Sequence, residues 1–98
     1  MEIKGRLAPF IAAVEAAEEG RRFAHKEVRD SVLELGALMD ERTRLLALGA
    51  SPASARLELL MEEELRVRAE LSFARELLLD VEQHLARKRQ ALRVALGR

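Results

Sequence analysis

The sequence predicts an all-α protein in which two long antiparallel helices form a coiled-coil helical hairpin. The first observation is composition: charged residues make up 35% of the 98 residues, and the only aromatic residues are three Phe. A chain dominated by Ala, Glu, Leu and Arg is typical of long helices and coiled coils. The second is a seven-residue apolar repeat in both halves of the chain. The third is a single break in that repeat, near the midpoint.

The break predicts a turn over residues 49–53. Gly49 can take the left-handed conformation that ends a helix. Ser51 can cap the next helix, and Pro52 suits its first position. We therefore expect one helix over about 9–48 and another over about 52–96, within a single domain covering 1–98.

The start of the first helix is marked by Gly5 and Pro9, which both disfavour a helix interior. We place Pro9 in the first turn of the helix. Residues 1–8 are then expected to be frayed or separately structured.

The heptad repeat assigns seam positions a and d along each helix. In the first helix the a positions are Leu7, Val14, Arg21, Val28, Leu35 and Arg42, and the d positions are Phe10, Ala17, Ala24, Ser31, Leu38 and Leu45. In the second helix the a positions are Leu57, Glu64, Leu71, Leu78, Leu85 and Leu92, and the d positions are Leu60, Val67, Ala74, Val81, Lys88 and Ala95.

An antiparallel pairing places each a residue opposite a d residue when the facing numbers sum to 102, which centres the turn on Ser51. Ala17 then faces Leu85, so a small residue meets a large one. Charges agree with the pairing, because a group of acidic residues comes alongside a group of basic ones: Glu15, Glu18 and Glu19 alongside Arg87, Lys88 and Arg89. Such exposed pairs contribute mainly to register.

Polar residues also occupy the seam, namely Arg21, Ser31, Arg42, Glu64 and Lys88. They cost stability and can specify register or oligomeric state, and the long side chains among them can reach out of the seam to water. We favour register control; the alternative is a binding site for a side chain of a partner.

Apolar residues beyond the seam predict a partner or dimer interface. The first helix carries Ile11, Val32, Met39 and Leu46 at e positions, which makes its apolar face wide enough for a bundle core. The second helix adds Leu65, Phe73 and Leu79 off its seam. We expect a homodimer that forms a four-helix bundle, or a complex with another helical protein.

The C-terminal end of the second helix is basic, with Arg87, Lys88, Arg89 and Arg93. Cations there favour the negative end of the helix dipole. The functional alternative is a docking patch for an acidic partner or nucleic acid, which would make the chain a small regulator. The net charge of zero argues against nucleic-acid binding.

Candidate chemistry is sparse. Cys is absent, and the histidines are His25 and His84. Asp80 and His84 are four residues apart and share a helix face, but two ligands do not make a metal site, so a solvated pair is the better interpretation. We expect no cofactor, no metal and no enzymatic activity.

The pattern of hydropathy shows neither a membrane span nor a signal peptide. The expected location is therefore the cytoplasm.

The stretch Val81-Glu82-Gln83-His84-Leu85-Ala86-Arg87-Lys88-Arg89-Gln90-Ala91-Leu92 resembles the second helix of coiled-coil hairpin proteins of type III export systems, the family of FliJ-like flagellar export stalk proteins. The resemblance implies a bacterial export chaperone or an ATPase-associated stalk. It carries over no functional residue. The wide apolar face of the first helix and the apolar residues of the second helix off its seam lead us to expect a non-enzymatic protein–protein interaction module that acts as adaptor, chaperone or scaffold.

Overall fold

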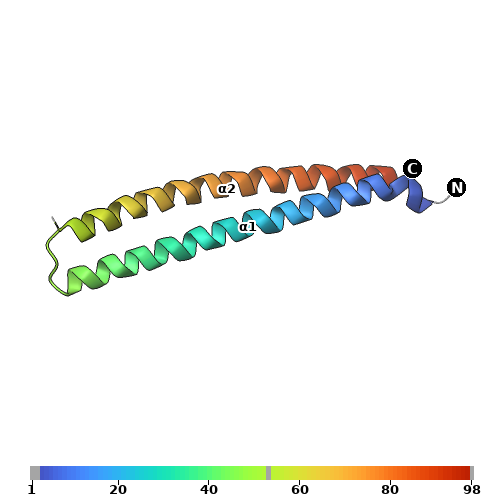
Figure 1. The fold of residues 1–98 in the computed structure, drawn as a ribbon. Coiled ribbons are helices and arrows are strands. Elements are labelled where there is room, and N and C mark those ends of the chain that lie inside the picture. The colour runs from blue at the N-terminus through green and yellow to red at the C-terminus, as the bar shows by residue number, and fades with distance from the viewer. Residues whose placement is uncertain (1–2, 53, 98) are drawn as a thin grey trace. The chain divides into compact units, whose positions relative to one another are not determined.

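The computed structural model describes residues 3–52 and 54–97, with side chains from Gly5 onward. It contains two helices, α1 (Ile3–Ala47) and α2 (Ala55–Leu96), joined by a short turn (Figure 1). The helices pack against each other as a hairpin, so the predicted fold class is confirmed.

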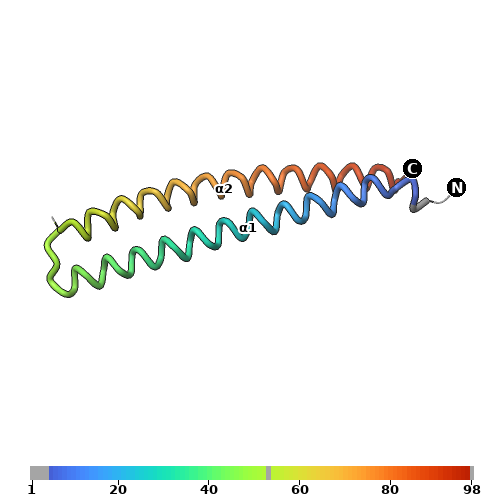
Figure 2. The backbone as a smooth tube through the Cα atoms, in the orientation of Figure 1, coloured from blue at the N-terminus to red at the C-terminus, as the bar shows by residue number. Residues whose placement is uncertain are grey.

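The hairpin divides into two compact units, each made of one segment from α1 and one from α2. Unit 1 comprises residues 1–26 and 75–98 and carries both ends of the chain (Figure 2). Unit 2 comprises residues 27–74 and carries the turn.

The seam of unit 1 contains the predicted a and d residues. Val14, Ala17 and Leu85 form one buried cluster, and Leu92 packs against it. The contact between Ala17 and Leu85 is the small-to-large pairing that the sequence predicts. Phe10 departs from the pattern, because it is a d residue that remains exposed.

The seam of unit 2 is buried more deeply on α2 than on α1. All of the a and d residues of α2 in this unit are buried: Leu57, Leu60, Glu64, Val67, Leu71 and Ala74. The a and d residues of α1 in this unit are only half-buried: Val28, Ser31, Leu35, Leu38, Arg42 and Leu45. One side of α1 in unit 2 is therefore incompletely covered by the hairpin itself.

The start of α1 corrects the sequence-based expectation. The helix begins at Ile3 and runs through Pro9, so residues 3–8 are neither frayed nor separate, while residues 1–2 lie outside the described part of the chain. Pro9 lacks the N–H that would bond the carbonyl of Gly5. The burial of Leu7, which is 5% exposed, offsets that loss by keeping the first turns on the seam.

The end of α1 confirms the predicted role of Gly49, whose φ is 87°. The backbone N–H of Gly49 donates to the Leu46 carbonyl (3.0 Å), and that of Ala50 donates to the Leu45 carbonyl (3.0 Å). This pair of bonds is a Schellman motif, which satisfies carbonyls that the helix end leaves open.

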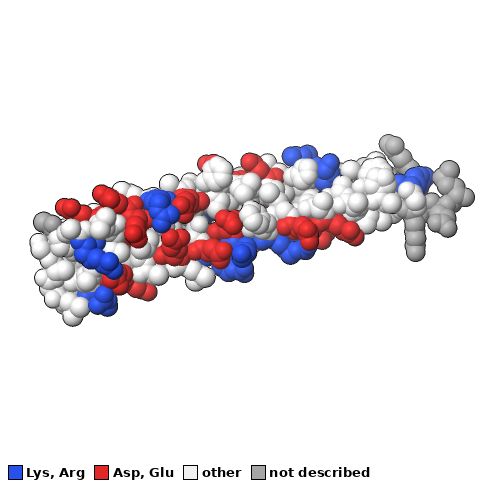
Figure 3. Space-filling model, in the orientation of Figure 1, with Lys and Arg blue, Asp and Glu red and all other residues white. Residues whose placement is uncertain are grey.

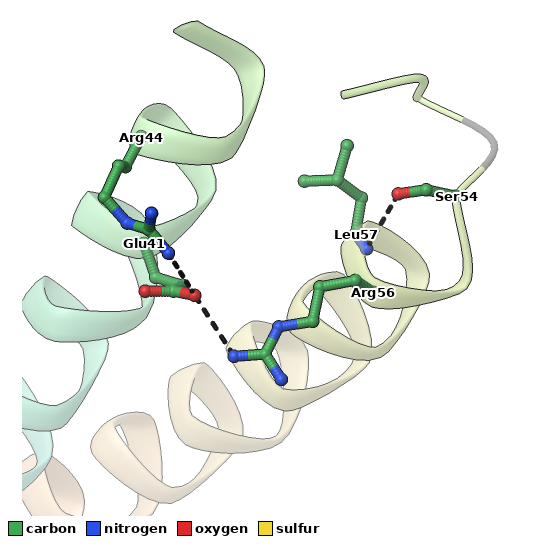
Figure 4. Close-up of polar contacts among 5 residues, drawn as sticks. All are labelled: Glu41, Arg44, Ser54, Arg56 and Leu57. Atoms are coloured by element: carbon green, nitrogen blue, oxygen red, sulfur yellow. Dashed lines mark hydrogen bonds and ion pairs between the residues drawn. The ribbon is translucent and has the colours of Figure 1, made fainter. Parts of the chain in front are cut away.

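The start of α2 corrects the predicted capping residue. Ser54, not Ser51, caps the helix: its Oγ accepts a hydrogen bond from the N–H of Leu57 (3.3 Å; Figure 4). The helix begins at Ala55, so Pro52 lies in the turn and not at the first helical position. The turn extends to Ser54, whose backbone N–H donates to the carbonyl of Ser51 (2.9 Å). Ala53 lies outside the described residues.

Candidate partner-binding surface

Contacts across the seam define two sides of the hairpin. In unit 1, the Arg89 guanidinium lies 3.7 Å from the Glu18 carboxylate, and His25 Nε2 lies 3.7 Å from Glu82. All four residues occupy e positions. In unit 2, Arg68 likewise meets Met39. We call this the e side of each unit; the opposite side, where g positions meet, is the g side.

The e side of unit 2 carries an uncharged stripe along α1. It consists of Val32, Gly36, Met39, Thr43 and Leu46, at alternating spacings of four and three residues, and we call it the α1 stripe. All five residues are exposed, although the three large side chains are apolar. The spacing is that of a second coiled-coil seam on the same helix.

Three of the α1 stripe residues were predicted as interface residues and two were missed. The predicted residues Val32, Met39 and Leu46 are 45%, 36% and 47% exposed. Gly36 and Thr43 sit at b positions between them, and reading b together with e would have found them. Their neutrality keeps the stripe free of charge.

Two residues of α2 extend this surface. Met61, which sequence reasoning also missed, is an exposed e residue whose register position lies beside Leu46. Leu65 follows one turn later on the same side and is 69% exposed. The α1 stripe, Met61 and Leu65 thus form one apolar surface on unit 2, which we call the e-side surface.

The remaining predicted interface residues lie elsewhere. Ile11 and Leu79 are exposed but belong to unit 1. Phe73, 70% exposed, occupies a c position of α2 in unit 2, toward the g side. The seven predicted residues are therefore distributed over two units and two sides, and only four of them belong to the e-side surface.

The g side of unit 2 is polar and internally paired. The Arg66 guanidinium bonds the carboxylates of Glu70 (2.7 Å) and Glu34 (3.1 Å), and these bonds, Glu70's first, raise the pKa of Arg66. A shallow hollow on this side is lined by Glu34, Ala37, Leu38, Glu41, Arg56, Leu59, Leu60 and Glu63. The carboxylates of Glu34, Glu41 and Glu70 already have guanidinium partners, so much of the charge on this side is satisfied within the hairpin.

Glu41 anchors the part of the g side nearest the turn. Its carboxylate accepts hydrogen bonds from Arg56 of α2 (3.1 Å) and Arg44 of α1 (3.0 Å; Figure 4). These bonds, that of Arg56 first, hold the pKa of Glu41 below its ordinary value. Two cations thus stabilise one carboxylate where the helices approach the turn.

The e side of unit 2 differs because Arg68, the cation at its e position, lacks an acidic partner. Arg68 donates to the sulfur of Met39 (3.8 Å). Within residues 3–52 and 54–97, no carboxylate forms an ion pair with Arg68. The e-side surface is therefore apolar, with an unpaired guanidinium group beside it.

The seam of unit 2 also contains an ion pair. Arg42 Nε lies 3.2 Å from Glu64 Oε1, and the Glu64 side chain is 8% exposed. Neither atom has a hydrogen-bond partner among the described residues, so the contact is electrostatic. The pair joins two of the polar seam residues that the sequence singled out for register control.

The basic C-terminal residues do not form one patch. Lys88 is half-buried at the seam, and Arg89 contacts Glu18. Arg93 bonds the side chain of Gln90 (2.6 Å), and Arg87 is exposed at a c position. Successive helix residues point about 100° apart, so these cations are spread around α2. The visible face in Figure 3 likewise shows charges of both signs interspersed with uncharged atoms.

The part of the chain that the structure describes contains neither a candidate metal-ligand cluster nor a helix that could cross a membrane. No group of three or more His, Cys, Asp or Glu residues is arranged there to hold a metal ion. Among the same residues, no helix has an apolar stretch long enough to cross a bilayer.

Compared with known proteins, the chain matches no family model, no curated protein and no solved structure.

Proposed function

We propose that this chain is a non-enzymatic protein–protein interaction module, an adaptor, chaperone or scaffold, that binds a helical partner on the e-side surface of unit 2. One observation carries the proposal: the α1 stripe remains exposed although the seam residues already account for the hairpin. A second seam on a helix has a purpose when a further helix packs on it.

Burial of apolar side chains would favour the binding of a helical partner on the e-side surface. Full burial of a Val, Leu or Met side chain contributes about 1.5–3 kcal/mol, and the e-side surface exposes five such side chains: Val32, Met39, Leu46, Met61 and Leu65. The half-buried seam residues of α1 would gain further cover. The occupant is a second copy, which completes a four-helix bundle, or another helical protein. The resemblance to export stalk proteins and the proposed cytoplasmic location accord with either.

The test is capture of partners by variants that place charge on the α1 stripe. The double variant Val32→Glu/Leu46→Glu is immobilised and exposed to a lysate of the native host to which tagged wild-type chain is added. It should no longer retain the proteins that the immobilised wild type binds, because glutamates on a buried seam oppose packing. Mass spectrometry identifies the retained proteins, and circular dichroism verifies that the helices remain.

Phe73→Glu is the matched control, because it changes an even more exposed apolar residue (70%, against 45% for Val32 and 47% for Leu46) on the g side of the same unit. It should retain wild-type capture. Capture that is unaffected by Val32→Glu/Leu46→Glu, or that depends on Phe73 alone, would contradict the proposed surface. If the wild type retains neither another protein nor itself, the proposed function fails.

A further inference from the structure

We infer that the e-side surface of unit 2 binds a second copy of this chain, antiparallel and around a two-fold axis, with Gly36 of each copy receiving Leu46 of the other. The inference rests on the proposed function and names its partner. It is carried by the spacing, the side-chain sizes and the charges of the e-side surface.

Gly36 is the first observation that favours close packing of another helix against α1. It lies in the interior of α1, where glycine costs roughly 1 kcal/mol relative to alanine. The hairpin gives no reason for it, because a Cβ at this position would meet nothing within 4 Å. On an exposed stripe with seam spacing, that open space suits a large side chain from another helix.

The α1 stripe can pair with itself antiparallel. In such a pairing an e residue of one copy faces a b residue of the other copy. The two-fold axis requires both copies to make the same contacts. Centred on residue 41, the pairing sets Gly36 opposite Leu46 of the second copy and Met39 opposite Thr43. A small residue meets a large one in every layer, as close packing requires.

The neighbouring register is less favourable. A shift of one heptad would set Arg29 opposite Leu46 of the second copy, which places a cation in an apolar layer. It would also bring Asp40, on the rim of the α1 stripe, beside Asp40 of the second copy, where like charges repel. The pairing centred on residue 41 avoids both.

The residues of α2 on the e side are self-complementary in charge as well as in shape. An antiparallel pairing of Met61 with Leu65 of the second copy also sets Glu58 opposite Arg68. Glu58 and Arg68 are exposed, and neither forms an ion pair within the described residues. Two Glu–Arg pairs would thus flank the apolar layers, one at each end, and disfavour other registers.

A single two-fold axis serves both helices. The α1 pairing is centred on residue 41 and the α2 pairing on residue 63. The hairpin register places residue 41 beside residue 61, so the two centres agree within two residues, which is about 3 Å along a helix. Both pairings come from residues of unit 2 alone.

The exposed area accommodates such an interface. The chain exposes 7238 Å², whereas a compact monomer of its 11.0 kDa mass would expose about 5,600 Å². A standard interface buries roughly 800 Å² per partner. Dimerisation on one side of unit 2 would therefore remove surface that a compact protein of this mass does not expose.

Cysteine cross-linking tests the pairing directly, because the chain contains no native Cys. Single-Cys variants Gly36→Cys and Leu46→Cys, mixed and oxidised, should form a disulfide-linked dimer, and so should Met61→Cys mixed with Leu65→Cys. Gly36→Cys mixed with Met39→Cys is the control, since those residues would lie one heptad, about 10 Å, out of register. Preferential cross-linking of Met39→Cys to itself would indicate parallel helices and overturn the inference.

Analytical ultracentrifugation tests the energetics. Gly36→Leu should weaken self-association at least tenfold at unchanged helicity, whereas Ala37→Leu, one residue along and about 100° around the helix, should associate as the wild type does. Arg68→Glu should also weaken association, and Glu58→Arg/Arg68→Glu should restore it, which a purely structural role would not explain. Equal association of Gly36→Leu and wild type would refute the pairing.

Failure of this inference is distinguishable from failure of the proposed function. A wild-type chain that stays monomeric at high micromolar concentration, but binds another helical protein in a manner abolished by Val32→Glu/Leu46→Glu, would overturn the self-pairing and leave the function standing. A monomer without such binding would overturn both.

Discussion

Glu64 lies buried in the seam of unit 2, where Arg42 of the facing helix supplies its countercharge at 3.2 Å. A buried ion pair contributes little net stability, because desolvation of both charges offsets their attraction. Substitution of Arg42 alone, however, leaves the Glu64 charge buried without a partner. We therefore assign this pair to the choice of register rather than to stability.

Arg42→Ala should lower the free energy of unfolding by roughly 1–3 kcal/mol, because it leaves the Glu64 carboxylate buried without a cation. Urea denaturation measures the change. The double variant Arg42→Leu/Glu64→Leu should be at least as stable as the wild type, since apolar layers replace the pair. A double variant as unstable as Arg42→Ala would show that the pair itself stabilises the fold.

Glu41 gives the chain a pH dependence at the turn end of unit 2. Its pKa is lowered in the folded chain, first by the hydrogen bond from Arg56. A carboxyl group with a lowered pKa stabilises the fold above its ordinary pKa, and this stabilisation is lost as the pH falls through the lowered value. Arg56→Gln should raise the pKa of Glu41, measured by carboxyl NMR titration, and reduce the acid sensitivity of unfolding. Arg87→Gln, on an exposed residue of unit 1, should leave that titration unchanged.

At the scale of elements, α1 and α2 use their faces differently. In unit 2, α2 buries all of its seam residues, while α1 leaves its own half-exposed and carries a second stripe beside them. A helix that offers two seams can contact two neighbours, and the hairpin supplies only one. Our proposal therefore assigns the larger part of the partner-binding surface to α1, between residues 32 and 46.

The first turn of α2 depends on Ser54. Ser54→Ala should destabilise the chain by about 1 kcal/mol, because the N–H of Leu57 loses its acceptor. Ser54→Asp should retain wild-type stability, since its carboxylate accepts the same bond and favours the helix dipole. Thermal unfolding followed by circular dichroism would compare the two, and equal losses in both variants would exclude Ser54 as the cap.

At the scale of the whole molecule, self-pairing couples stability to concentration. If two copies bind through unit 2, dilution favours unfolding by mass action. The melting temperature of the wild type should rise between 1 and 100 µM protein, which are about the limits for optical melting, while that of Gly36→Leu should change little. Wild-type melting that is independent of concentration would count against the dimer.

The heptad positions of both helices, the hairpin and the helix-ending role of Gly49 were predictable from the sequence, because apolar spacing and glycine's tolerance of positive φ are local properties. The helix starts were not. Leu7, an a residue, is buried at the seam, and α1 begins before Pro9; the N–H of Ser54 donates to the Ser51 carbonyl, and Ser54 caps α2. Both outcomes depend on contacts in the folded chain that the local preferences of Pro9 and Ser51 do not include.

For the candidate surface, too, some features were predictable from the sequence and others were not. The sequence by itself determined which residues the seam leaves over, including Val32, Met39 and Leu46, because a heptad assigns them to e positions. Only the tertiary structure decided that these three lie with Met61 on one side of unit 2, that Phe73 lies toward the other, and that the basic residues near the C-terminus are dispersed. The physical reason is that a heptad fixes a residue's angle on its own helix, whereas the neighbours at that angle depend on how the two helices meet.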